Sequence, residues 1–161
     1  MEFFSYLCNK IFDSLMVRLI VLIVIILLLV IIVPFVRQLL MDKRDLRNLP
    51  IEERFKTIMN VVNNGFFDGK ADLTLFDDDP RLANMMNKDR PSMLVQFYYS
   101  TGHLTVTLNH MCFRHELIWK KLFSNARNWS EFNQVDCGRD FVENAIHQIH
   151  EHEAYVMTHI Q

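Results

Sequence analysis

Residues 94–109 read LVQFYYSTGHLTVTLN, and this stretch decides the fold because its alternation predicts a β-hairpin. If Thr101 and Gly102 form a two-residue loop, the flanking strands pair so that the strongly apolar residues share one face of the sheet. That apolar face carries Val95, Phe97, Tyr99, Leu104, Val106 and Leu108. The opposite, more polar face carries Gln96, Tyr98, Thr105 and Thr107. We predict that this second face is open to a protein partner.

Two amphipathic helices are predicted to cover the apolar face of the hairpin. The first begins at Pro50, and Asn63-Asn64-Gly65 is expected to end it. Its buried residues follow helical spacing and are Ile51, Phe55, Ile58, Met59 and Val62. The second helix is C-terminal, with Ser130 or Asp136 as its cap. Its predicted buried stripe is Phe141, Val142, Ala145, Ile146, Ile149 and Val156.

The segments around the hairpin complete a predicted α+β domain. Residues 71–76 (ADLTLF) alternate like a short strand, and Asp79 is expected to cap a short helix that starts at Pro80. The alternative for Asp77, Asp78 and Asp79 is a calcium or magnesium site, but they lack the alternate spacing and the downstream Glu of a calcium loop. Residues 111–123 are predicted to form a third meander strand after a turn at Asn109-His110, although a helix is the other interpretation.

A membrane segment precedes this domain. Residues 19–36 read LIVLIVIILLLVIIVPFV and contain sixteen Leu, Ile or Val residues with no polar or charged side chain. As a helix this run covers roughly 27 Å, close to the thickness of the hydrocarbon layer. A cleaved signal peptide fits less well, because the run is long and no small-x-small cleavage site follows it. We therefore predict a single uncleaved transmembrane helix over 17–36.

Basic residues around this segment predict its orientation. Lys10 and Arg18 precede the apolar run, and Arg37, Lys43, Arg44 and Arg47 follow it. The positive-inside rule then places the C-terminal domain in the cytoplasm.

The predicted organisation has four parts. Residues 1–16 form an amphipathic segment, either a helix lying in the membrane interface or an extension of the spanning helix. Residues 17–36 span the bilayer, 37–50 form a juxtamembrane helix or linker, and 51–161 form the soluble domain.

The histidine-rich C-terminus is the stretch closest to a chemical site. His147, His150 and Glu151 lie on the side of the predicted helix away from its apolar stripe, where they can approach a zinc ion. An ordinary solvated helix face explains the same residues, and no H-E-x-x-H pattern occurs. We therefore predict no metal, cofactor or catalytic residue, and keep a membrane-tethered, metal-dependent hydrolase as the alternative.

Other reactive groups and charges point away from catalysis and nucleic-acid binding. Cys8, Cys112 and Cys137 are odd in number and widely spaced, which disfavours a disulfide framework. On one continuous strand, His110 and Cys112 share a face while His115 points away, so no thiolate–imidazole pair is expected. Residues 52–161 carry eleven Lys or Arg against fifteen Asp or Glu, which disfavours nucleic-acid binding.

These observations lead to one expectation about function. The chain is predicted to be a membrane-anchored, non-enzymatic interaction or adaptor domain. Its expected partners are the lipid bilayer and another protein, and an accessory subunit of a membrane assembly is one form of this role.

Overall fold

The chain consists of a long N-terminal helix and an α+β domain, as the sequence predicts. The computed structural model describes residues 2–159, with side chains described for residues 17–159. Helix α1 (Glu2–Asn48) is continuous over 47 residues. The chain divides into two compact units, one ending at Leu40 and the other beginning at Met41. The second unit holds all of the strands and the remaining helices.

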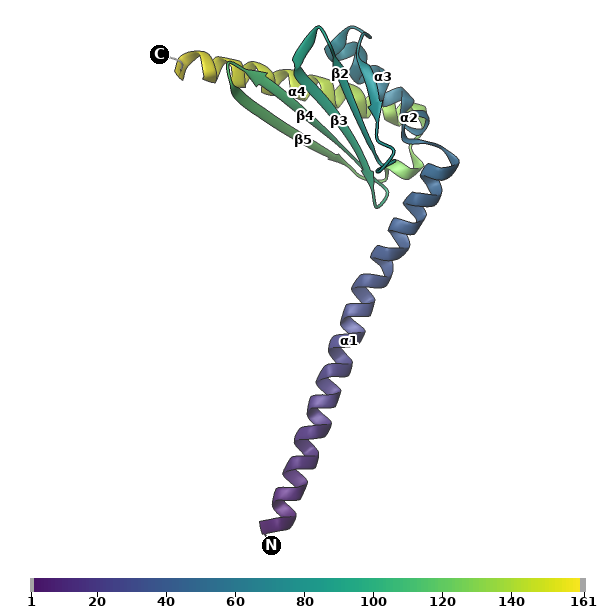
Figure 1. Cartoon of the computed structure of the whole chain (residues 1–161), viewed down its shortest axis with the longest axis vertical. Helices are drawn as coiled ribbons and strands as arrows, with labels where there is room; N and C mark the ends of the chain where they lie inside the picture. Colours follow the sequence, from purple (N-terminus) through teal and green to yellow (C-terminus); the bar gives the residue numbers. More distant parts are fainter. Residues whose placement is uncertain (1, 160–161) are drawn as a thin grey trace. The chain divides into compact units, whose positions relative to one another are not determined.

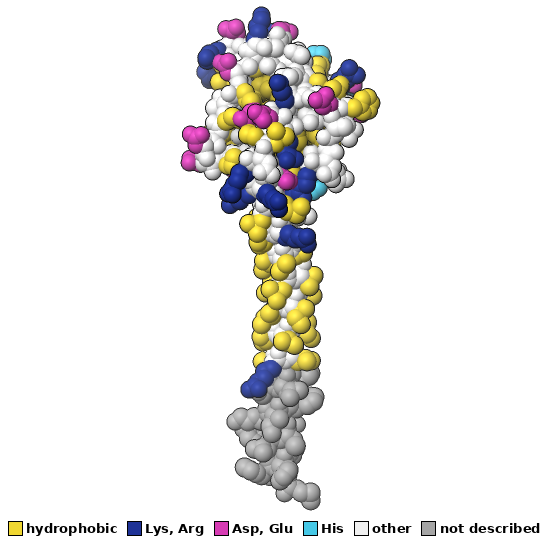
Figure 2. Space-filling view, turned by 90° about the vertical axis from the view of Figure 1, so that its right-hand side faces the viewer, with side chains coloured by type: hydrophobic (Ala, Val, Ile, Leu, Met, Phe, Trp, Pro, Cys, Tyr) yellow, Lys and Arg dark blue, Asp and Glu magenta, His cyan; other side chains and the backbone are white. Residues whose placement is uncertain are grey.

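The apolar part of α1 is long and apolar enough to cross a membrane, by its length and composition. Side chains 17–38 are all exposed in the isolated chain, and Figure 2 shows the resulting hydrophobic band between Lys and Arg side chains. None of the most apolar part of this band is buried within the described chain. The amphipathic pattern predicted for residues 1–16 depends on side chains that lie outside those described.

Five antiparallel strands form one sheet in chain order (Figure 1). They are β1 (Asp72–Leu75), β2 (Leu82–Asn87), β3 (Arg90–Ser100), β4 (His103–Cys112) and β5 (His115–Phe123). The predicted hairpin register is confirmed: Tyr99 lies opposite Leu104, and the pairs Phe97–Val106 and Val95–Leu108 follow. Thr101 and Gly102 adopt positive φ angles of 54° and 76°, as a two-residue hairpin loop requires.

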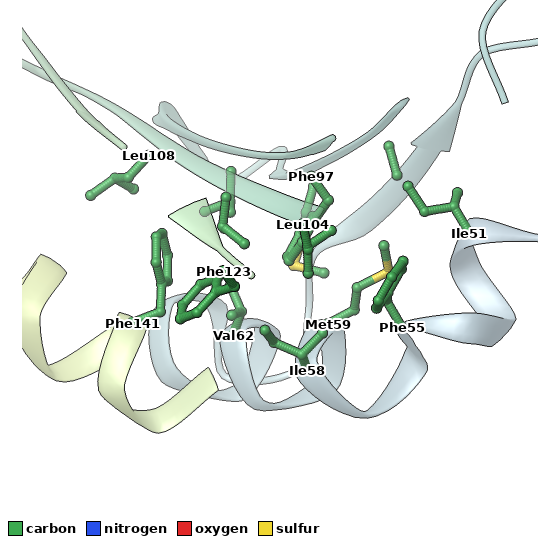
Figure 3. Packing of buried hydrophobic residues seen from close by; sticks show 14 of the residues in the cluster. Ile51, Phe55, Ile58, Met59, Val62, Phe97, Leu104, Leu108, Phe123 and Phe141 are labelled. Carbon is green, nitrogen blue, oxygen red and sulfur yellow. The ribbon is translucent and has the colours of Figure 1, made fainter. Parts of the chain in front are cut away.

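The helices cover one face of this sheet, which we call the inner face (Figure 1). They are α2 (Ile51–Arg54), α3 (Lys56–Phe67) and α4 (Glu131–His159), with a short 3₁₀ helix, η1 (Ala126–Asn128), before α4. All six hairpin residues predicted to be buried are 0% exposed. Figure 3 shows side chains of α3 and α4 directed toward Phe97, Leu104 and Leu108. The sequence prediction of a meander packed against two amphipathic helices is confirmed, with a break at Phe55 separating α2 from α3.

Aromatic contacts join the sheet to the helices that cover it. The ring of Phe141 on α4 lies 4.9 Å from that of Trp119 on β5 and 6.2 Å from that of Phe66 on α3. The ring centroids of Phe55 and of Tyr99 on β3 are 5.3 Å apart. Aromatic pairs at these separations add to the stability that comes from burial alone.

The short helix expected after Pro80 is wrong. Residues 82–87 form strand β2, because Ala83 and Met85 alternate onto the inner face and pair with Phe97 and Val95 of β3. Asp79 accepts a hydrogen bond from the backbone N–H of Arg81 at 3.2 Å, within a turn and not at a helix start.

The turn expected at Asn109-His110 is also misplaced. Strand β4 continues to Cys112, and the turn falls at Phe113 and Arg114, where φ is 45° and 71°. The longer register places His110 opposite Leu117 and puts Leu117, Trp119 and Phe123 on the inner face of β5. As a consequence Cys112 pairs directly with His115, so these two side chains share a face, contrary to the prediction from a continuous strand.

Helix α3 runs past the predicted stop at Asn63-Asn64-Gly65. It ends at Phe67, followed by Asp68 in the left-handed conformation at φ 54°. Gly65 serves packing instead: a Cβ added there would lie 2.7 Å from Cγ1 of Val142 on α4. Absence of a side chain at Gly65 therefore lets α3 and α4 approach closely.

Helix α4 begins as predicted, and most of its stripe is buried. The Ser130 hydroxyl accepts a hydrogen bond from the backbone N–H of Asn133 at 3.2 Å, which makes Ser130 the cap. Phe141, Ala145, Ile149 and Val156 are buried, and Val142 packs on the core. Ile146 is 37% exposed, so its assignment to the buried stripe is wrong; it lies at the edge of the stripe, beyond the cover of the sheet.

The close approach of α3 and α4 yields a stability prediction. We expect Gly65→Ala to destabilise the full chain by about 1–2 kcal/mol, because overpacking against Val142 outweighs the better helix propensity of alanine. Urea unfolding in mild detergent, followed by circular dichroism, measures the change. Exposed Asn64→Ala is the matched control, and Val142→Ala in the Gly65→Ala background should restore part of the loss. An unchanged midpoint for Gly65→Ala would show that α3 and α4 can move apart to accommodate the methyl group with no loss in the free energy of unfolding.

Candidate functional site

The sheet face opposite the helices, which we call the outer face, brings the predicted partner residues together. Gln96 lies directly opposite Thr107, and Tyr98 lies opposite Thr105. All four are partly exposed, and they occupy the centre of the five-stranded sheet because β3 and β4 are its third and fourth strands. A hydrogen bond from Nε2 of Gln96 to Oδ1 of Asn84, at 3.2 Å, extends this polar centre onto β2.

Exposed apolar side chains flank the polar centre of the outer face. Leu122 is opposite Thr105 and is 64% exposed, and Ile118, opposite Asn109, is 62% exposed. On β2, toward the opposite edge of the same face, Met86 is 42% exposed. The register that buries the inner face therefore leaves a mixed surface on the outer face, with neutral hydrogen-bonding groups between apolar ones and with exposed Lys120 opposite Thr107.

One cation is held in place beside this surface. The guanidinium of Arg81 lies 5.5 Å from the centroid of the Tyr98 ring. Two hydrogen bonds, of 2.8 and 3.0 Å, join it to the carboxylate of Asp79. The side-chain hydrogen bond from Arg81 lowers the pKa of Asp79, and the same bond raises the pKa of Arg81. Both groups therefore stay charged at neutral pH, with the Arg81 cation beside the ring of Tyr98.

A groove of about 330 Å³ lies where the helices leave β1 uncovered. Its lining mixes acidic, amide and apolar side chains: Glu52, Glu53, Lys56, Met59, Asn60, Asn63, Ala71, Leu73 and Met85. Leu73 is 38% exposed and Leu75 is 44% exposed, although both have the parity of the inner face. The inner face is thus closed over β2 to β5 and partly open at its β1 edge.

The C-terminal histidines lie on the exposed side of α4. Nε2 of His147 is 3.4 Å from Oε1 of Glu151, with 70% and 59% of the two side chains exposed. His150 is also exposed. Among residues with described side chains, no group of three or more His, Cys, Asp or Glu is placed to hold a metal ion. The pair alone is typical of a solvated helix face.

Two other histidines attach the end of α4 to the β4–β5 hairpin. His110 is 8% exposed, and its Nε2 lies 3.2 Å from Oε1 of Glu153. Nε2 of His152 lies 3.2 Å from the backbone carbonyl oxygen of His115. These contacts position the last turns of the helix over the hairpin.

A buried carboxylate joins the C-terminal end of α1 to the domain. Asp42 is 0% exposed, and its carboxylate accepts hydrogen bonds from the backbone N–H groups of Thr101 and Gly102, the latter at 3.1 Å. Nη2 of Arg127 donates to the same carboxylate at 2.5 Å, and Nε of Arg127 lies 2.7 Å from Asp45. The tip of the β3–β4 hairpin is thereby fixed to residues 41–48.

The sequence alone does not connect Asp42 or Asp45 with any residue of the domain. Asp42 and Arg127 are 85 residues apart, so no local pattern connects them. One available signal was Leu46, which is 5% exposed and follows Asp42 by one helical turn.

Comparisons with protein-family models, with curated proteins and with solved structures give no match for this chain.

The buried position of Asp42 leads to a second stability prediction. We expect Asp42→Asn to destabilise the full chain by about 2–4 kcal/mol, because the amide cannot accept from both backbone N–H groups and also pair with Arg127. Exposed Asp77→Asn removes the same charge and should change stability by less than about 0.5 kcal/mol. Thermal unfolding in mild detergent compares the two. Equal effects of the two substitutions would show that the contacts of Asp42 with the hairpin tip and Arg127 do not stabilise the domain.

Proposed function

We propose that the chain is a membrane-anchored, non-enzymatic interaction domain that binds a protein partner through the outer face of its sheet. The observation that carries this proposal is the outer face itself. Gln96, Tyr98, Thr105 and Thr107 form a polar centre there, bordered by exposed apolar side chains and by Lys120, and no helix of the described chain covers it.

The composition of this face supports a protein as its partner. The centre of a protein interface is typically depleted of charge and enriched in Tyr and Met, with neutral hydrogen-bonding groups that fix the register of the complex. Tyr98 supplies an aromatic anchor, and the guanidinium of Arg81 lies 5.5 Å from its ring centroid. A rigid aromatic side chain loses little conformational entropy on binding, so it is suited to an energetic hot spot.

Helix α1 supports the anchored part of the proposal. Its exposed apolar band has the length that a spanning helix needs. The basic residues Arg37, Lys43, Arg44 and Arg47 on its C-terminal side favour a cytoplasmic location for the domain. Such an anchor would confine the outer face to partners that are near the same bilayer, including subunits of a membrane assembly.

Substitution of the polar centre tests the partner surface. We expect Tyr98→Ala with Thr105→Ala to reduce a specific co-purifying protein about tenfold in pull-downs from solubilised membranes, because a buried hot-spot aromatic contributes at least 1–2 kcal/mol. Tyr155→Ala with Thr158→Ala is the matched control, since it removes the same residue types from the exposed side of α4.

Site-specific photocrosslinking separates direct contact from an indirect loss. A crosslinking residue at Thr107 should attach to the same protein, and one at Thr158 should not. Unchanged partners in the outer-face variant would remove the proposal. A crosslink to a second copy of the chain would show that the outer face mediates self-association and does not bind a different protein.

Fractionation of the full chain tests the anchor and its orientation. We expect the intact chain to stay in the membrane pellet after alkaline carbonate washing, and its domain to resist added protease until the cytoplasmic side is opened. Both outcomes follow from the apolar segment and its flanking cations. Recovery of a shortened chain in the soluble fraction would instead identify the apolar segment as a cleaved signal sequence.

A further inference from the structure

Residues 41–48, the end of α1 that belongs to the domain, separate their charges onto two sides of the helix. At 100° per residue, Asp42, Asp45 and Leu46 fall within an arc of roughly 100°. Lys43, Arg44 and Arg47 fall within a second arc of about the same width, centred roughly 160° away. The sequence MDKRDLRN therefore mixes signs along the chain, while the helix places acid and base on opposite sides.

The structure neutralises only the acidic side. Arg127 pairs with Asp42 and Asp45, and the hairpin amides of Thr101 and Gly102 satisfy the rest of the Asp42 carboxylate. These two acids therefore cannot turn outward to neutralise their basic neighbours.

The basic side stays exposed and free of acidic partners. Lys43, Arg44 and Arg47 are all exposed, and within residues 17–159 none of them forms an ion pair. Three unneutralised cations on one helix face form a compact positive patch.

We propose that this basic face, Lys43, Arg44 and Arg47, binds the anionic phospholipid headgroups of the membrane that holds α1. The three cations follow the apolar segment by seven to eleven residues, within the window in which juxtamembrane Lys and Arg interact with a bilayer surface. This inference rests on the proposed anchoring of α1, and it adds lipid selectivity to that anchor.

Lipid explains this face better than a nucleic acid does. The domain that carries the patch is acidic overall, with fifteen Asp or Glu against eleven Lys or Arg in residues 52–161, so a long polyanion would meet repulsion beyond the patch. A headgroup is small and needs only the local positive charge. Each juxtamembrane cation attracts it independently, and salt screens the attraction within a Debye length.

The test uses the full chain reconstituted in liposomes of phosphatidylcholine with a minor fraction of phosphatidylglycerol. Polymer-bounded nanodiscs cut from these liposomes are captured through the protein, and mass spectrometry gives their lipid ratio. We expect phosphatidylglycerol enrichment of about threefold over the bulk ratio, which disappears at high salt. Lys43→Gln with Arg44→Gln and Arg47→Gln should return the ratio to the bulk value.

A charge-matched control isolates the patch from net charge. Lys70→Gln with Arg114→Gln and Arg139→Gln removes three exposed cations elsewhere on the domain and should leave the enrichment unchanged. Enrichment that survives the first triple substitution, or that both triple variants lose equally, would overturn the inference.

Flotation with pure phosphatidylcholine liposomes tests the anchor separately. A chain that floats with neutral lipid but shows no enrichment keeps the proposed anchor and loses the lipid selectivity. A chain that does not float with neutral lipid loses the anchor itself.

Discussion

The register of β3 against β4 is the constraint on which the rest of the domain depends. Because side chains alternate along a strand, a shift by one residue would move Phe97, Tyr99 and their neighbours to the solvent side. The observed register places them all on one face, where α2, α3 and α4 cover them. The same pairing places Tyr98 and Thr105 together on the other face. Core and candidate partner surface are therefore two consequences of one register.

Sequence reasoning succeeded where a local period determines the structure. Alternation fixed the hairpin, and 3.6-residue spacing identified both helices that cover it. It failed where tertiary packing overrides a local signal. Gly65 has the residue type of a helix stop, but contact with Val142 requires a glycine within a helix. At the β4–β5 turn, Phe113 and Arg114 adopt positive φ although neither residue type favours it, so pairing between the strands decides the turn.

The outer face was predictable in position, because it is the complement of the core. Gln96 and Thr107 lie together as alternation requires. The Asp42–Arg127 clamp was not predictable, since its members meet only when η1 and the hairpin tip reach the end of α1. The sequence of a mixed run such as residues 42–47 does not show which charges remain exposed and unpaired. The fold determines this, because it neutralises some of the charges internally. Here the acids face the domain and the bases face solvent.

The proposed functions of the two surfaces depend on each other physically. A mixed outer face of this kind gives modest affinity, because the entropy lost on association offsets much of what its contacts contribute. Confinement to a bilayer raises the effective concentration of the chain toward any partner held in the same membrane, and linked binding events gain affinity without new contacts. Lipid contacts at Lys43, Arg44 and Arg47 would further restrict where in the membrane the domain resides. On this view the anchor brings the domain close to other proteins of the same membrane. The polar centre around Tyr98 then determines which of these proteins the domain binds.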